Sequence, residues 1–100
     1  MDIVLKETER LSQNSENIFR EEEDGAFLFD PETGNLKYIN TMGVNIYQLC
    51  DGSMTVGEVT TLVIDNFKDI AREQIETDVK HFLEALVEIN FLKREEAPDD

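Results

Sequence analysis

The spacing of apolar residues changes at Asn40, and this change restricts the folds that are open to the chain. Before it, residues 18–40 hold three short apolar runs separated by turns that contain Gly25 and Gly34. Runs of about five residues joined in this way predict an antiparallel meander. After Asn40 apolar residues recur every three or four positions, which indicates helices that bury one face. The sequence therefore predicts an α+β fold, a three-stranded antiparallel sheet followed by three helices.

Turn residues set the expected bounds of the strands. We expect strands at residues 18–22, 26–30 and 35–39. Between the last two, Pro31 presets φ and Gly34 tolerates a positive φ, so the chain is expected to reverse there.

Capping residues set the expected bounds of the helices. Asn40 or Thr41 suits the N-cap of the first helix, and Gly52 suits its left-handed C-terminal position. Thr55 with Glu58 three residues later has the pattern of a capping box, which predicts the start of a second helix. The third helix is expected from about residue 71 to residue 89, after which the chain folds back onto the core. This order of elements is that of a winged helix-turn-helix.

The two ends of the chain look unlike the middle. Residues 1–17 mix short apolar pieces with Ser, Asn, Gln and Glu, which favours a flexible N-terminal tail. Residues 18–94 are the expected domain, and residues 95–100 are expected to be an acidic C-terminal tail.

Charge and composition exclude several classes of function. Twenty-three acidic residues face nine basic ones, a formal net charge of −14, and this field repels nucleic acid, which is normally bound through Lys and Arg. No apolar run approaches the roughly 18 residues of a membrane span, and the N-terminus lacks the pattern of a secretory signal. A single cysteine fits a reducing compartment, so a cytoplasmic protein is expected.

The sequence offers little for catalysis. Cys50 is followed by Asp51, whose carboxylate disfavours a thiolate, so a buried structural cysteine is the favoured interpretation. His81 is the only histidine, and no metal site or phosphate-binding loop is found. We therefore expect a protein that is not an enzyme.

Two stretches of the chain carry motifs of a known family. The positions of the first motif are Ile39, Asn40, Ile46, Leu49, Asp51, Gly52, Thr55 and Val56. Those of the second are Asp78, Val79, Phe82, Leu83, Leu86, Phe91 and Leu92. With these motifs, roughly residues 18–93 resemble the PqqD family, also called RiPP recognition elements, which bind precursors of ribosomally made, post-translationally modified peptides. Asn90 stands where the family usually has Gly, but Asn also tolerates the left-handed conformation.

The resemblance implies a non-catalytic peptide chaperone. The leader of a precursor peptide would add as a strand beside residues 36–40 and lie against the third helix, which is β-augmentation. Which border of that helix faces the peptide is left open by the periodicity. The implied peptide-binding residues are Leu36, Lys37, Tyr38, Ile39, Asn40, Asp78, Lys80, His81, Phe82, Leu83 and Val87.

The resemblance also implies a second partner, usually a radical S-adenosylmethionine (SAM) maturase, in a natural-product pathway. Iron–sulfur cofactors would belong to that partner, and no cofactor is expected on this chain, which is expected to be a monomer or a weak dimer without membrane or nucleic-acid partners. Two alternatives are a helix-turn-helix transcriptional regulator and an acidic protein-interaction domain. The regulator is disfavoured because the third helix carries mostly acidic residues on its polar side.

Overall fold

The predicted meander and helices are present in the computed structural model, which describes residues 4–95. The strands pair antiparallel in the order β2-β3-β4. They are β2 (Ile18–Glu22), β3 (Gly25–Phe29) and β4 (Leu36–Asn40), and the helices are α1 (Thr41–Leu49), α2 (Val56–Asn66) and α3 (Arg72–Glu88). The α+β, winged-helix fold class is therefore confirmed.

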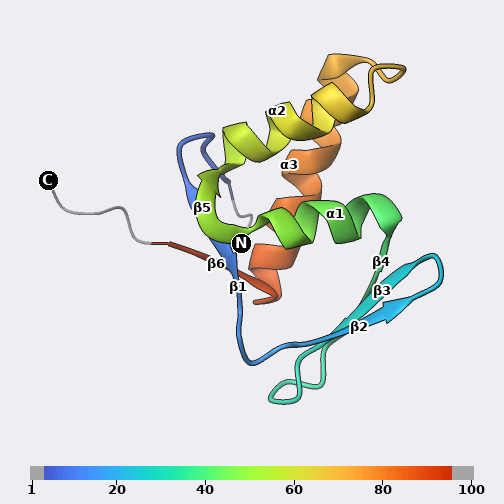
Figure 1. Ribbon diagram of the computed structural model, residues 1–100. Coiled ribbons are helices and arrows are strands. Elements are labelled where there is room, and N and C mark those ends of the chain that lie inside the picture. Colours follow the sequence, from blue (N-terminus) through green and yellow to red (C-terminus); the bar gives the residue numbers. More distant parts are fainter. Residues whose placement is uncertain (1–3, 96–100) are drawn as a thin grey trace, which may run out of the picture.

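One face of this sheet packs into the core beneath α1 (Figure 1). Side chains alternate between the two faces of a strand, and Ala26, Leu28 and Ile39 are buried on the face toward α1. On β2 the ring of Phe19 stacks on that of Tyr47 in α1, with centroids 5.8 Å apart and planes 3° apart. The sheet is thus attached to the helices by one face only.

A second small sheet was not predicted. It has the order β5-β1-β6 and consists of β1 (Arg10–Gln13), β5 (Asp51–Thr55) and β6 (Leu92–Arg94), all antiparallel. Leu5 and Leu11 are 4% and 2% exposed. The prediction of a flexible tail at residues 1–17 is therefore wrong for residues 4–17, because this segment supplies the central strand of a sheet.

The same sheet changes the interpretation of the corner after α1. Gly52 has the expected positive φ of 89°, but it lies in β5 rather than at the end of the helix, which is capped by Cys50. At the other end of the sheet the Glu95 N–H donates to the Arg10 carbonyl at 2.8 Å. The rest of the predicted acidic tail lies outside the described residues.

The predicted N-caps of α1 and α2 are confirmed. The Asn40 side chain accepts a hydrogen bond from the Gly43 N–H at 2.8 Å, and Thr55 and Glu58 form a capping box with bonds of 2.8 and 3.1 Å. Asn90 adopts the left-handed conformation with φ 67°. In the described part of the chain, each helix is too short or too polar to cross a bilayer.

Candidate functional site

β4 lies at an edge of its sheet, and its register shows which backbone groups it leaves open. Among the described residues β4 pairs only with β3. The Asp30 N–H donates to the Asn35 carbonyl at 2.9 Å, and in an antiparallel pair such bonded pairs occur at every second residue. Lys37 and Ile39 therefore pair with β3, whereas the N–H and C=O groups of Leu36 and Tyr38 point away from it.

The geometry at Gly25 supports this assignment. A Cβ atom built on Gly25 would lie 2.1 Å from the carbonyl oxygen of Ile39, so that carbonyl is directed toward β3. The outer edge of β4 thus presents the backbone N–H and C=O groups of Leu36 and Tyr38. These unpaired groups make the edge a template for an additional strand.

An apolar groove lies beside the end of β4, between the first half of α1 and α3. Its volume is about 220 Å³. The polar groups that line it are those of Asn40 and Asp78. Its apolar lining consists of Met42, Ile46, Ile70, Ile75, Val79 and Phe82. An open strand edge next to an apolar groove can hold an extended peptide by its backbone and select it by its side chains.

Gly43 brings the two walls of the groove together. A Cβ atom at this position would lie 3.1 Å from the ring of Phe82 and 3.1 Å from the Cβ of Ile39. The glycine weakens α1 by about 1 kcal/mol relative to alanine, and in return the Phe82 ring of α3 lies directly against the first turn of α1.

The predicted peptide-binding residues lie in different places on β4 and α3. Leu36 and Tyr38 are exposed on β4, by 63% and 47%, whereas the Ile39 side chain is in the core. Lys37 is half-buried.

On the helical side the structure brings Asn40, Asp78 and Phe82 together at the groove. Lys80 and His81 are exposed on α3 and are not part of the groove lining. Leu83 is fully buried and Val87 is half-buried against the core. These placements show that the border of α3 with Asp78 and Phe82 faces the groove.

Sequence reasoning missed several residues of the groove. Met42 and Ile46 of α1 and Ile75 and Val79 of α3 line the groove, whereas helical periodicity indicates only which face of a helix is apolar. Ile70 carried a usable signal, since it is an apolar residue in the polar link between α2 and α3, and its side chain is 39% exposed.

Cys50 is a buried structural residue, as predicted. Its side chain is 2% exposed, and its Sγ donates to the Ile46 carbonyl at 3.4 Å. Burial, and secondarily the charge of Asp51, raises the pKa of the Cys50 thiol to about 12. A thiol in this state is a poor nucleophile. Within residues 4–95, no three His, Cys, Asp or Glu side chains are grouped to hold a metal ion.

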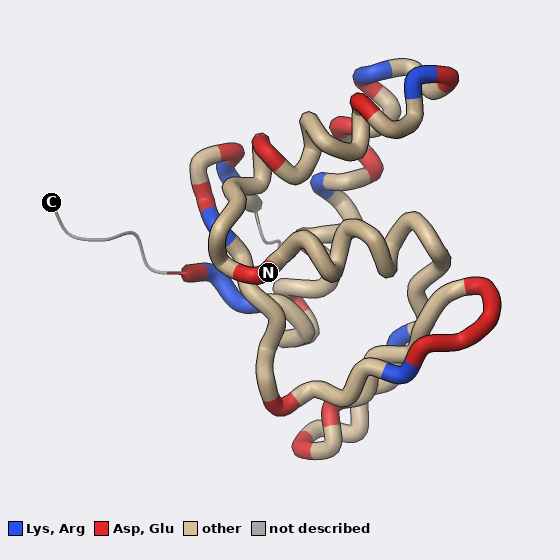
Figure 2. Tube along the Cα trace, viewed as in Figure 1, with Lys and Arg blue, Asp and Glu red and all other residues tan. Residues whose placement is uncertain are grey.

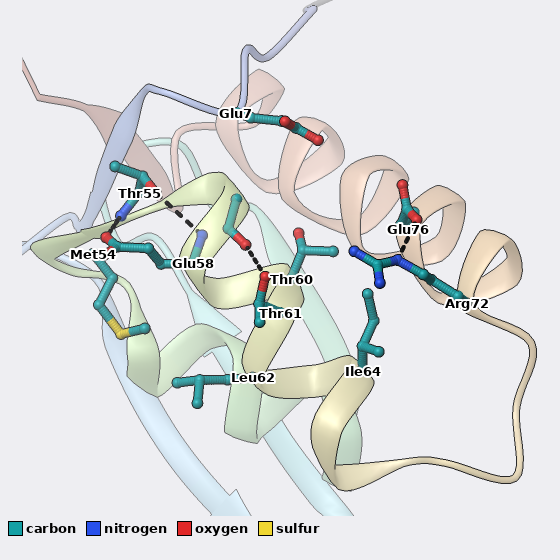
Figure 3. A pocket seen from close by; sticks show the side chains of 11 residues that line it. Glu7, Met54, Thr55, Glu58, Thr60, Thr61, Leu62, Ile64, Arg72 and Glu76 are labelled. Carbon is teal, nitrogen blue, oxygen red and sulfur yellow. Dashed lines mark hydrogen bonds and ion pairs between the residues drawn. The ribbon is translucent and has the colours of Figure 1, made fainter.

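A larger hollow of about 610 Å³ lies beside α2 and the start of α3 (Figure 3). Apart from Glu7, its polar side chains already bind one another or the backbone. Thr55 and Glu58 form the capping box, Arg72 and Glu76 form an ion pair at 3.2 Å, and the Thr61 hydroxyl donates to a helix carbonyl. We therefore regard the groove beside β4 as the functional site.

Comparisons with known proteins show a family and a fold that this chain shares. Residues 25–92 match the family described as Coenzyme PQQ synthesis protein D, whereas no curated protein sequence matches the chain. The structure of TbiB1 in complex with the TbiA(beta) leader peptide is 20% identical, with a TM-score of 0.70 over 88% of this chain and 99% of the other. That of lasso peptide synthetase B1 complexed with the leader peptide is 17% identical, with a TM-score of 0.70 over 84% and 98%.

Proposed function

The chain belongs to the PqqD family, and from this premise we propose that it binds the leader of a ribosomally made precursor peptide and presents it to a modifying enzyme. The observation that carries the proposal is the open outer edge of β4 beside the apolar groove. Two proteins of the same fold, TbiB1 and lasso peptide synthetase B1, have structures in complex with a leader peptide, which supports the proposal.

The proposed mode of binding is β-augmentation. The outward N–H and C=O groups of Leu36 and Tyr38 would pair with the peptide backbone, so that affinity comes mainly from groups that every peptide has. Every second peptide side chain would then face the groove, where Phe82 and Ile70 favour apolar side chains. Asp78, which lines the same groove, favours a polar or basic side chain of the peptide. The other predicted contacts on α3 remain predictions.

The partner enzyme is proposed as a class rather than as one protein. The family resemblance implies a radical SAM maturase, whereas one structure of the same fold is titled a lasso peptide synthetase. We therefore propose a peptide-modifying enzyme, and the genes beside that of this chain will identify its chemistry. In this proposal the chain itself is not catalytic.

The surface of α3 disfavours the alternative of a DNA-binding regulator. Its exposed acidic residues are Glu73, Glu76, Asp78 and Glu88. A recognition helix reads bases through Arg, Lys, Asn and Gln, and phosphates would be repelled by these carboxylates.

Two apolar residues of equal exposure provide a matched test of the groove. Ile70 and Leu62 are each 39% exposed, but only Ile70 lines the groove. With a synthetic leader from the precursor gene nearest to that of this chain, Ile70→Ala should weaken binding about tenfold, which is about 1.4 kcal/mol. Leu62→Ala should leave the dissociation constant within about twofold.

Calorimetric titration measures both dissociation constants. Equal affinities for the two variants would show that the peptide does not occupy the groove. Absence of binding by the unmodified chain to every leader encoded nearby would contradict the proposed function itself.

A further inference from the structure

The face of the β2-β3-β4 sheet that points away from α1 is apolar. The side chains that alternate onto this face are Ile18, Arg20, Phe27, Phe29, Leu36 and Tyr38, and at its end beside Gly25 also Glu22. Ile18, Leu36 and Tyr38 are 52%, 63% and 47% exposed. Phe27 packs edge-to-face on Tyr38 with centroids 5.4 Å apart, and a shallow hollow of about 380 Å³ lies on this outer face.

No described helix or strand covers this outer face (Figure 1). Singly exposed apolar residues are normal, but contiguous ones on a soluble domain mark interaction surfaces. Polar residues alternating with the core positions would have sufficed to form these strands. The aromatic and aliphatic side chains on the outer face are therefore unexplained by folding alone.

Charge restricts what can bind there. Residues 18–40 contain six acidic and two basic residues. Glu21 and Glu22 at the end of β2, with Glu23 and Asp24 in the turn after it, form an acidic rim at one end of the sheet (Figure 2). Arg20, on the face itself, is paired with Glu22 at 3.5 Å. A partner with an apolar patch edged by Lys and Arg is complementary to such a surface. A second copy of this chain would bring a further net charge of −14 and an identical acidic rim, so like charges would oppose it.

The outer face also borders the edge of β4. A peptide added to β4 would place every second side chain beside Leu36 and Tyr38 on this same face. A protein that docks on the outer face would thus contact the sheet and the bound peptide together.

We propose that the outer face is the docking site of the modifying enzyme, which binds it with an apolar patch surrounded by basic residues. The inference rests on the proposed function and adds the surface by which the partner recognises the loaded chain. The leader then occupies the edge of β4 and the enzyme occupies the outer face over β2 and β3, so their binding can be separated by mutation.

The variant that tests the inference is Ile18→Thr combined with Phe29→Thr. These cross-strand partners lie on β2 and β3, away from the edge of β4, and threonine retains a high strand propensity. The probes are the purified modifying enzyme encoded beside the gene for this chain and the leader peptide of the same gene cluster. We expect leader affinity to stay within about twofold, which also shows that the variant is folded, and enzyme affinity to fall at least about tenfold.

A second variant tests the charge. Glu23→Lys in the acidic turn should weaken enzyme binding about threefold or more and make it less sensitive to salt, and Leu62→Ala on α2 should have no effect.

Undiminished enzyme binding by the double variant would overturn the inference while the leader-binding function stands. A wild-type dimer in sedimentation that becomes a monomer in the double variant would assign the outer face to a second copy and would also overturn it. Absence of leader binding by the wild-type chain would instead contradict the proposed function.

Discussion

The thiol of Cys50 illustrates how surroundings decide the chemistry of a single residue. It lies at the end of α1, is 2% exposed and is followed in the chain by Asp51. Burial is the larger cause of its raised pKa, and the charge of Asp51 adds to it. The same burial raises the pKa of Tyr47.

We predict that Cys50 of the native protein reacts very slowly with iodoacetamide. With a pKa of about 12, instead of about 8.5 for an exposed thiol, the thiolate is scarce at pH 8. The alkylation rate should be at least about 100-fold lower in the native protein than in 8 M urea (a concentration on the order used for full unfolding). Mass spectrometry measures both rates, and comparable values would contradict the buried position.

The direction of the pKa shift also gives the direction of the pH dependence. The folded state retains a proton that the unfolded state loses above about pH 8.5. Cys50 therefore contributes stability that is fully present below that pH and is lost as the pH rises toward about 12. The variant Cys50→Ser should therefore lose less stability at alkaline pH. It should still lose some, because burial also raises the pKa of Tyr47.

At the scale of elements, β4 was predicted correctly in position, but its outward groups required the register. The pairing with β3 places the N–H of Tyr38 on the open edge and that of Ile39 inside the sheet. Local patterns could identify the strand, because turns and alternation are local signals. They could not show the phase of the hydrogen bonds, which depends on the partner strand.

We predict that Tyr38→Pro weakens leader binding at least about tenfold while the protein remains folded. Proline removes an N–H, and at this position the lost donor faces outward rather than toward β3. Tyr38→Ala is the control, since it retains the N–H but loses the hydroxyl bond to the Asp24 carbonyl at 3.0 Å. Equal affinity of the two variants in fluorescence anisotropy would show that this N–H does not pair with the peptide.

β1 is the element that sequence patterns missed. It has one deeply buried apolar residue, Leu11, and its partners β5 and β6 lie about 40 and 80 residues further along the chain. A strand with so few apolar residues is recognisable only from the strands with which it pairs. β5 was not predicted for the same reason, and it lies in the sequence between two helices with clear signals. The meander and the caps were predictable because their determinants lie within a few residues of one another.

We predict that Leu11→Ala destabilises the protein by about 2–4 kcal/mol, the range for truncating a buried leucine. Val4→Ala, at a side chain that is 66% exposed, should change the free energy of unfolding by less than about 0.5 kcal/mol. Urea denaturation measures both. Equal, small effects would mean that the N-terminal segment does not pack as the structure shows.

On the scale of the whole molecule, the groove is formed by residues that are far apart in the sequence. The end of β4, the first turns of α1 and the border of α3 meet there, and Gly43 permits their close approach. Resemblance to the family pointed to this strand and this helix, so the predicted peptide-binding residues include Asn40, Asp78 and Phe82, which line the groove. Helical periodicity could not select the border of α3, and so Lys80, His81, Leu83 and Val87 were included although they lie outside the groove lining.

The arrangement assigns separate tasks to three surfaces of a 100-residue chain. The core face of the sheet holds the helices, the edge of β4 is proposed to receive the peptide, and the outer face is proposed to receive the enzyme. This separation follows from the attachment of the sheet by one face, which leaves its other face and its edge open (Figure 1).

Amide hydrogen exchange with and without a saturating leader peptide tests the proposed strand addition most directly. Residue-resolved rates on β4 should change alternately. The amides of Leu36 and Tyr38 should exchange at least about tenfold more slowly when the peptide is bound, whereas those of Lys37 and Ile39, already paired with β3, should be slow in both states. Unchanged exchange at Leu36 and Tyr38 in a chain that has bound the peptide would contradict the account.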